Sequence, residues 1–262
     1  MDLGLKGRRA LVMGASKGLG RSIADALAAE GVALVVSGRD QASLDAVAAE
    51  LRAAGAPAAH GVPADIASAA DMDRLVTEAE RLLGAVDILV LNHGGPPPGG
   101  PLEITQDQLV EWFPRIVLHP IRVATRLIPA MRERGYGRVI TVGSTGMEQP
   151  IPNLALSNIL RGAIVGWNKS MALEVAGQGV TCNILAPGAI LTGRLRETSA
   201  SAAKVRGVDA DVIIHERAKT IPAGRVGRPE EFGPLAAFLC SDKAAYITGS
   251  ILRIDGGMVR SI

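Results

Sequence analysis

Cysteine and aromatic residues are scarce in this chain. Its 262 residues include two cysteines, Cys182 and Cys240, which lie in apolar surroundings without a Cys-x-x-Cys or a Cys/His spacing. This pattern argues against a disulfide framework and against a zinc site, so we expect buried structural thiols and no metal. Aromatic residues make up 3% of the chain, and a large stacking ligand would therefore find few platforms.

An excess of charge of one sign is missing as well. The 28 basic and 26 acidic side chains give a net charge of +2 and form no basic run, so neither nucleic acid nor a membrane surface is indicated as a partner. No apolar run approaches 18 residues, and none of signal length precedes the first glycine-rich turn. We therefore expect a soluble cytoplasmic protein. A small anionic ligand stays open.

Short apolar runs alternate with helical patterns along the whole chain. Seven runs have the length and β-branched character of buried strands, at residues 10–13, 33–37, 58–62, 87–91, 138–142, 180–185 and 250–254. Between most of them lie Ala/Leu/Glu/Arg-rich segments that end at a glycine, where a helix C-cap is expected. This alternation predicts a Rossmann-type doubly wound parallel α/β sheet with helices on both faces, in a single domain over residues 1–262.

Two segments interrupt the alternation. The stretch GGPPPGGP, residues 94–101, excludes helix and central strand, so we expect a loop that forms a stiff wall of a substrate pocket. An insertion at about residues 190–223 is rich in Ala, Ser and Arg. Because long insertions at the carboxyl edge of a parallel sheet are often lids, we expect a substrate lid there. The alternatives are a plain surface turn for the first segment and a surface helical pair for the second.

The stretch MGASKGLG, residues 13–20, lies between the first strand and the first helix. Its glycines permit a tight turn, close approach of the backbone to a pyrophosphate and close helix–strand packing, while the helix N-terminus offers oriented N–H groups. We therefore expect the turn to bind a dinucleotide. The residues expected to do so are Gly14, Ser16, Lys17, Gly18, Leu19 and Gly20.

The end of the second strand indicates which dinucleotide binds. An acidic residue there would bind the adenosine ribose and repel a 2′-phosphate, but this chain has Gly38 followed by Arg39. The planar, permanently charged fork of Arg39, with Lys17 as a second cation, suits a phosphate. NADP(H) is therefore favoured over NAD(H). The alternative is that Arg39 is a solvated loop charge and that Asp40 binds the ribose.

The spacing G-x-x-x-G-x-G of this turn resembles that of the short-chain dehydrogenase/reductase family. VDILVLNHGG (86–95) resembles the family's strand-four motif, NILAPGAILT (183–192) its Pro-Gly motif, and residues 227–257 the family's end. On these motifs the chain is identified as a member. The resemblance implies further cofactor contacts at Asp65, Ile66, Asn92, Gly94, Pro187, Gly188, Ile190 and Thr192.

The resemblance also implies a catalytic serine, tyrosine and lysine and a relay asparagine, from which this chain departs. Ser144 fills the serine place, but Ser157 stands at the tyrosine place, Arg161 at the lysine place and Ile116 at the asparagine place. A serine hydroxyl is a poor general acid, whereas Arg161 can stabilise an oxyanion or bind a carboxylate or phosphate. His93, whose type titrates near physiological pH, is the candidate proton donor, directly or through a water. Its alternative role is to cap the strand-four loop.

The favoured hypothesis is an atypical NADP(H)-dependent oxidoreductase that acts on a carbonyl or alcohol substrate in the manner of a 3-oxoacyl reductase. Its candidate catalytic residues are Ser144, Ser157, Arg161 and His93. One alternative is a protein that binds NADP(H) without redox turnover. The other is an isomerase or lyase for an anionic substrate on the same scaffold. The resemblance, with an apolar helix at residues 154–167, implies a homodimer or homotetramer.

Overall fold

Seven parallel strands form the centre of the molecule in a computed structural model that describes residues 2–261. The strands are β1 (Arg9–Val12), β2 (Ala33–Gly38), β3 (Ala59–Pro63), β4 (Ile88–Leu91), β5 (Gly137–Val142), β6 (Val180–Pro187) and β7 (Ile251–Ile254). They lie in the order β3-β2-β1-β4-β5-β6-β7, and every neighbouring pair is parallel. Each of the seven runs predicted from the sequence overlaps one strand, with bounds that differ by no more than two residues.

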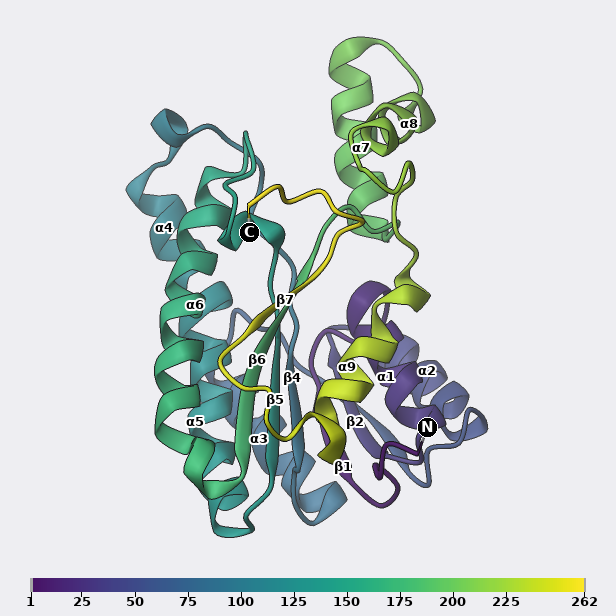
Figure 1. Cartoon of the computed structure of the whole chain (residues 1–262), viewed down its shortest axis with the longest axis vertical. Helices are drawn as coiled ribbons and strands as arrows, with labels where there is room; N and C mark the ends of the chain where they lie inside the picture. The colour runs from purple at the N-terminus through teal and green to yellow at the C-terminus, as the bar shows by residue number, and fades with distance from the viewer. Residues whose placement is uncertain (1, 262) are drawn as a thin grey trace.

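Helices cover both faces of the sheet (Figure 1). They are α1 (Gly18–Ala29), α2 (Gln41–Ala53), α3 (Ala69–Leu83), α4 (Gln106–Phe113), α5 (His119–Glu133), α6 (Ala155–Val175), α7 (Gly193–Arg206), α8 (Ala210–Lys219) and α9 (Gly233–Cys240). Apolar side chains of α1, α2 and α9 pack on one face, and those of α3, α5 and α6 pack on the other. The predicted doubly wound fold in one domain is confirmed.

The order of the strands reverses next to β1, and this reversal locates the binding crevice. Strand β1 pairs with β2 on one side and with β4 on the other. From β1 the chain therefore builds the sheet outward through β2 and β3 to one edge. It then crosses back to β4, next to β1, and builds outward through β5, β6 and β7 to the other edge. In open parallel sheets the carboxyl ends of the strands diverge at this switch point and leave a crevice for a ligand.

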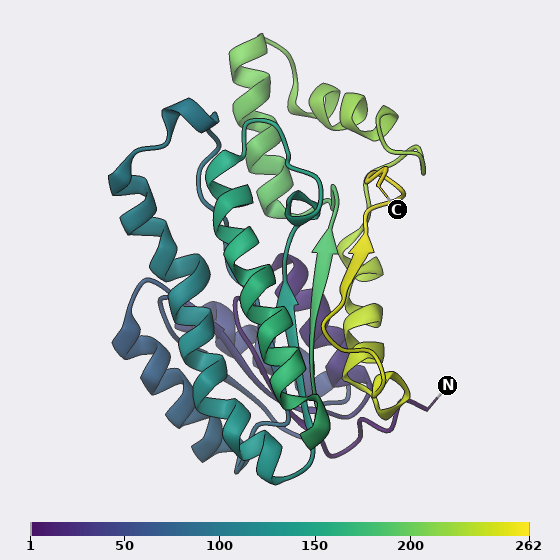
Figure 2. The same ribbon diagram turned by 60° about the vertical axis from the view of Figure 1, so that its left-hand side comes forward.

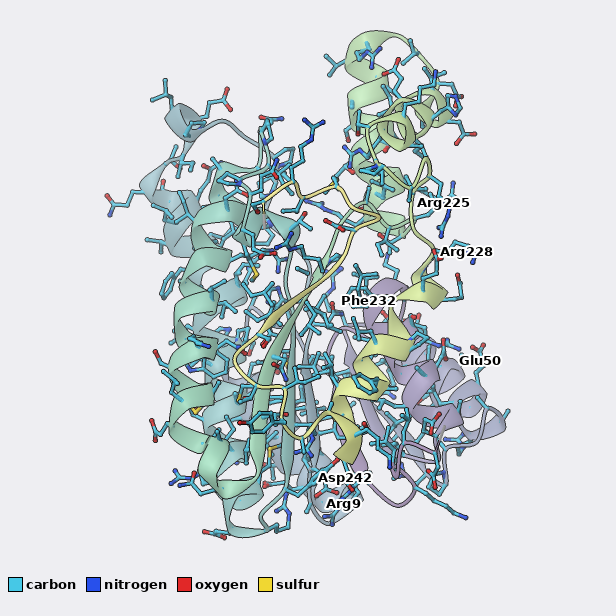
Figure 3. All side chains as sticks on the ribbon, viewed as in Figure 1. Arg9, Glu50, Arg225, Arg228, Phe232 and Asp242 are labelled. Carbon is cyan, nitrogen blue, oxygen red and sulfur yellow. The ribbon has the colours of Figure 1, made fainter. Side chains whose placement is uncertain are left out.

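Helices α7 and α8 project beyond the carboxyl ends of the strands (Figures 1 and 2). They fill most of the segment expected to be a lid. The chain returns from them through Arg225, whose guanidinium donates to both carboxylate oxygens of Glu231 at 2.8 and 2.6 Å. Hydrogen bonds from Arg225 and from the Arg228 backbone lower the pKa of Glu231 to about 2. Arg225 and Arg228 are labelled in Figure 3.

The proline-rich segment is a loop from Gly94 to Gly100, and Pro101 begins a short 3-10 helix, η1 (Pro101–Glu103). Gly99 N donates to Asn153 O at 2.9 Å, and Ala155 N donates to Gly99 O at 3.2 Å. These bonds fix the loop to the segment that enters α6. Within residues 2–261, no helix is long and apolar enough to cross a membrane.

The edge strand β3 is protected against pairing with another chain. Leu34 N donates to Ala58 O, so alternate carbonyl groups of β3 face away from the sheet. Side chains occupy these outward carbonyls: Arg52 Nη1 on Ala59 O at 2.6 Å, Gln41 Nε2 on Gly61 O at 3.4 Å and Arg74 Nη2 on Pro63 O at 2.9 Å. Covered carbonyls and charged side chains are common protection for an exposed edge.

A partly buried ion pair stabilises the end of the sheet where the strands begin, opposite their carboxyl ends. Asp87 is 4% exposed and accepts from Arg9 Nε and Nη2, both at 2.8 Å, and from the Arg9 backbone N at 3.2 Å. Arg134 lies 3.5 Å from the same carboxylate. Arg9 is labelled at this amino end in Figure 3, far from the carboxyl ends of the strands. The pair therefore stabilises the fold without contacting the crevice.

We predict that Asp87→Asn lowers the free energy of unfolding by about 2 kcal/mol, because a bidentate charged hydrogen bond is lost at a buried position. Urea unfolding followed by circular dichroism measures the change. Asp45→Asn is the control, since Asp45 is exposed and accepts one bond from Gln41; it should change the free energy by less than about 0.5 kcal/mol. Equal effects of the two substitutions would contradict a stabilising role for the buried pair.

Candidate cofactor and active site

The glycine turn after β1 is packed too closely for side chains. Gly14 and Gly18 have φ values of 58° and 65°, in the left-handed region that favours glycine. A Cβ on Gly20 would lie 2.4 Å from Gly14 O and 2.5 Å from Asn92 Nδ2. Asn92 Nδ2 donates to Gly14 O at 2.9 Å and to Met13 O at 3.2 Å. The side chain at the end of β4 therefore braces the turn at the end of β1.

The N-terminus of α1 is open to a ligand. Lys17 is its N-cap and its side chain makes no capping hydrogen bond, whereas Thr192 caps α7 by accepting from Leu195 N. A Cβ on Gly18 would lie 3.6 Å from Thr192 Cγ2, so the residue that caps α7 contacts the turn. Uncapped N–H groups, a positive helix end and a lysine fit the pyrophosphate of a dinucleotide.

The residues after β2 bear on the choice between the two dinucleotides. Arg39 and Lys17 are exposed, and neither forms an ion pair with a carboxylate of residues 2–261. Asp40 instead caps α2 by accepting from Ser43 N at 2.8 Å. Hydrogen bonds from the Ser43 hydroxyl and backbone lower the pKa of Asp40. The Asp40 carboxylate, which would favour the unphosphorylated ribose of NAD(H), is thus engaged in capping α2.

The remaining cofactor candidates lie at the same edge of the sheet. Asp65 Oδ1 accepts from Ala67 N at 2.9 Å after β3, and the carbonyl of Ile66 accepts from the buried His119 ring. A Cβ on Gly38 would lie 3.4 Å from Ser16 Oγ, so the end of β2 is next to the glycine turn.

The Pro-Gly segment follows β6 and lies against the tail of the chain. Gly188 N donates to Ile254 O at 3.0 Å, and a Cβ on Gly188 would lie 2.7 Å from Asp255 Cα. Ile190 is buried and bridges to Gly227. With Pro187 as the last residue of β6, residues 187–192 connect the sheet to helices α7 and α8. Every predicted cofactor residue therefore lies at the carboxyl edge of the sheet.

Arg161 on α6 is the most deeply buried charge among the catalytic candidates, with 9% of it exposed. Its Nε donates to Ser157 Oγ at 3.3 Å, and its Nη1 donates to Val142 O at 3.1 Å. Burial, and then the positive charge of Arg194, lower the pKa of Arg161 to about 10. The guanidinium therefore remains charged at neutral pH and holds the serine hydroxyl one helical turn before it.

His93 differs from the expectation drawn from its residue type. Its Nδ1 lies 2.9 Å from Gly94 O, and because a carbonyl oxygen only accepts, Nδ1 carries the hydrogen. Burial, and then the charge of Arg161, lower the pKa of His93 to about 4. The ring is therefore neutral at physiological pH, and its Nε2 is an acceptor. A pKa lowered this far does not favour His93 as a direct proton donor at neutral pH, whereas its role through a water stays a prediction.

Ser144 and Ile116 complete the set. Ser144 follows β5, and its Oγ accepts from Gly146 N at 3.1 Å; in the described chain no hydrogen bond joins it to Ser157. Ile116 is 1% exposed on a π-helical turn, η2 (Pro114–Leu118), and packs in an apolar cluster with residues of α6. The structure thus groups Ser157, Arg161 and His93. It places the apolar side chain of Ile116 at the position where the family resemblance implies a relay asparagine.

Sequence reasoning missed Arg194, which lies in the first turn of α7. Its Nη2 donates to Pro96 O at 2.8 Å, and its charge acts on Arg161. The only sequence signal was an arginine two residues after Thr192, among several others in the insertion.

For metals, no group of three or more His, Cys, Asp or Glu side chains suited to an ion occurs in residues 2–261. Cys182 and Cys240 are buried free thiols.

The fold and the open helix terminus define a dinucleotide-binding protein, and comparisons with known proteins specify the family. Residues 14–259 match the family model described as "Enoyl-(Acyl carrier protein) reductase". The chain is 33% identical over 254 residues to "Dehydrogenase/reductase SDR family member 4" of Bos taurus, covering 97% of this chain and 88% of that protein. It is 33% identical over 265 residues to the 3-oxoacyl-[acyl-carrier-protein] reductase FabG of Escherichia coli (strain K12), covering 98% and 99%.

Solved structures agree. L-sorbose reductase from Gluconobacter frateurii, complexed with NADPH and L-sorbose, aligns with a TM-score of 0.94 at 30% identity over 100% of both chains. An actinorhodin polyketide ketoreductase variant with NADPH aligns with a TM-score of 0.91 at 30% identity, over 97% of this chain and 98% of that one. The chain belongs to the short-chain dehydrogenase/reductase family of oxidoreductases, which confirms the resemblance found in its motifs.

We predict that His93 stays neutral, with its hydrogen on Nδ1, until the pH falls to about 4. An unfolded histidine binds a proton below about pH 6.5, so the unfolded state binds more protons and the stability conferred by this residue falls between pH 6.5 and 4. Nitrogen-15 NMR of the imidazole rings, with His93→Asn to assign the signal, measures both properties. Protonation of His93 at pH 6, or a hydrogen on Nε2, would contradict the assignment.

Proposed function

We propose that the protein is an NADP(H)-dependent oxidoreductase for a carbonyl or alcohol group, in which a serine–arginine pair binds the reacting oxygen. The observation that carries the proposal is the hydrogen bond from Arg161 Nε to Ser157 Oγ, close to His93 at the carboxyl edge of the sheet. FabG and L-sorbose reductase are reductases by name, and the latter is complexed with NADPH. These likenesses support a carbonyl substrate and the same cofactor.

The cofactor would be held by the glycine turn and the residues around it. The uncapped N-terminus of α1 and Lys17 suit the pyrophosphate, and Arg39 suits a 2′-phosphate. The segment from Pro187 to Thr192, with Asn92 and Gly94, borders the expected nicotinamide place. When bound, the nicotinamide supplies or accepts the hydride.

Ser157 is prepared to donate a hydrogen bond. Its oxygen accepts from Arg161, so its own hydrogen is free for the oxygen of a substrate carbonyl. The charge of Arg161, buried behind the serine, stabilises negative charge that develops on that oxygen. Because Arg161 is also bonded to Val142 O, the pair is oriented before the substrate arrives.

In this proposal a water gives its proton to the substrate oxygen, and the hydroxide that remains exchanges with the solvent. Ser157 is too weak an acid, and Arg161 keeps its proton. The neutral His93 accepts through Nε2 and can orient a water at the substrate oxygen. In alcohol oxidation, the same ring can receive the proton through that water. Loss of a positioned acid costs on the order of 10² to 10⁴ in rate, so we expect slow turnover or an electron-poor carbonyl substrate.

Two features outside the chemistry complete the proposal. Helices α7 and α8 would form a lid, because their first residue follows Thr192 at the glycine turn. The chain would form a homodimer or homotetramer through α6, on which Ile159 and Leu173 are 53% and 76% exposed. Exposed apolar side chains on one helix support an interface between copies of the chain.

We predict that Ser157→Ala lowers kcat/KM for ketone reduction about 10- to 100-fold, because a hydrogen bond to the reacting oxygen is lost. The dissociation constant for NADPH should not change. Steady-state oxidation of NADPH and fluorescence titration measure the two quantities. Ser170→Ala is the control: Ser170 lies on the same helix but bonds to Gly166 O on the exposed side.

Unchanged kcat/KM in Ser157→Ala would remove the serine from the proposed mechanism. NADPH binding without oxidation of NADPH across a broad panel of ketones would instead favour a protein that binds the cofactor without redox turnover.

We predict that Arg39→Ser weakens NADPH binding about 10- to 100-fold and leaves NADH binding unchanged, since only NADPH carries the 2′-phosphate. Titration of each cofactor by calorimetry measures the preference. Arg217→Ser is the matched control, an exposed arginine on α8 far along the chain from the turn. Equal losses for the two cofactors would contradict a phosphate contact by Arg39.

A further inference from the structure

Two arginines from different elements meet at one loop beside the proposed active site. An added Cβ on Gly95 would lie 3.9 Å from Arg161 Nη2, and Arg194 Nη2 donates to Pro96 O at 2.8 Å. The loop is itself anchored to the start of α6 through Gly99. One guanidinium thus approaches from α6 and the other from α7, on a wall stiffened by proline.

Neither guanidinium has an acidic partner. Arg161 and Arg194 form no ion pair with any carboxylate of residues 2–261, while Arg9 and Arg225 are paired bidentately. Burial of an unpaired charge is unfavourable, and Arg161 is 9% exposed. Two like charges at one loop raise that cost further. An anion between them would offset both contributions.

Both side chains retain free donors. A guanidinium has five N–H groups. Arg161 uses one on Ser157 and one on Val142, and its Nη2 makes no hydrogen bond within the described chain. Arg194 uses one on Pro96. The remaining N–H groups fit the oxygens of a carboxylate or phosphate, which an arginine binds with charge-assisted hydrogen bonds.

We propose that the substrate carries a carboxylate or phosphate group, bound by Arg161 and Arg194 beside the Gly94–Pro96 loop. This inference rests on the proposed function and specifies its substrate class. Because Arg161 also holds Ser157 at the reacting oxygen, the anionic group lies within a few bonds of the carbonyl carbon. The substrate is therefore a small 2-oxo or 3-oxo acid, or a carbonyl compound with a phosphate at a similar distance. Its anion joins the lid helix α7 to α6.

Calorimetry on the protein loaded with NADP⁺ tests this without turnover, since the oxidised cofactor cannot reduce a ketone. The probes are 2-oxobutanoate, acetoacetate and dihydroxyacetone phosphate, with two methyl esters and dihydroxyacetone as their uncharged counterparts. We expect at least one anion to bind about 10-fold or more tightly than its counterpart. Arg194→Gln should weaken that anion about 10- to 100-fold and leave its counterpart unchanged. Arg196→Gln, at an exposed arginine of the same helix, should leave both unchanged.

Three results would overturn the inference. The first is that no anion binds more tightly than its counterpart. The second is that Arg194→Gln leaves anion affinity unchanged. The third is that Arg194→Gln weakens NADP⁺ as much as it weakens the anion, which would assign the arginine to the phosphates of the cofactor. Reduction of neutral ketones together with the second result would leave the proposed function intact. Tight anion binding without any ketone reduction would overturn the proposed function and leave the anion site of Arg161 and Arg194 intact.

Discussion

The side-chain amide of Asn92 holds together the three elements on which the carboxyl edge of the sheet depends. It lies at the end of β4, bonds to two carbonyls of the glycine turn after β1, and leaves no space for a Cβ where α1 begins. The position of the uncapped helix end is therefore coupled to β4. His93 is the next residue, so the same end of β4 that braces the glycine turn also carries the ring whose pKa the charge of Arg161 lowers.

A buried arginine sets the character of the rest of the site. At the equivalent place the family resemblance implies a lysine, a flexible point charge. Arg161 has instead a planar group whose bonds to Val142 O and Ser157 Oγ fix its orientation. It lowers the pKa of the neighbouring imidazole, and it has no carboxylate in the described chain to neutralise it. One residue thus orients the serine, adds to the effect of burial in lowering the pKa of the histidine, and leaves positive charge unbalanced.

The fold could be predicted from the sequence, because apolar runs and glycine stops record burial and helix ends directly. All seven strands and the loop at 94–100 follow from such patterns. The motifs likewise placed the cofactor residues at one edge, since the carboxyl ends of parallel strands share it. The sequence leaves the alternatives at Asp40 and Arg39 open, because it does not show that the Asp40 carboxylate accepts from Ser43 N.

The details of the catalytic end could not be predicted in the same way. The tautomer of His93 depends on the direction of one carbonyl, and its pKa depends first on burial and then on a charge 68 positions later in the chain. Arg194 contacts the loop only because α7 leaves the sheet at Thr192 in one particular direction. Sequence periodicity records which residues are buried, but it does not record where a long side chain on a surface helix ends.

The two titrating neighbours of Ser157 share a further property. Because the pKa of His93 is lowered to about 4 and that of Arg161 to about 10, neither side chain changes its charge near neutral pH. The electric field that these two side chains exert on a bound substrate is therefore insensitive to acidification of the surrounding solution. Changes in acidity near neutrality therefore reach such a reaction through the proton that the substrate oxygen takes up and through the ionisable groups of the substrate, and not through the charge of these two side chains.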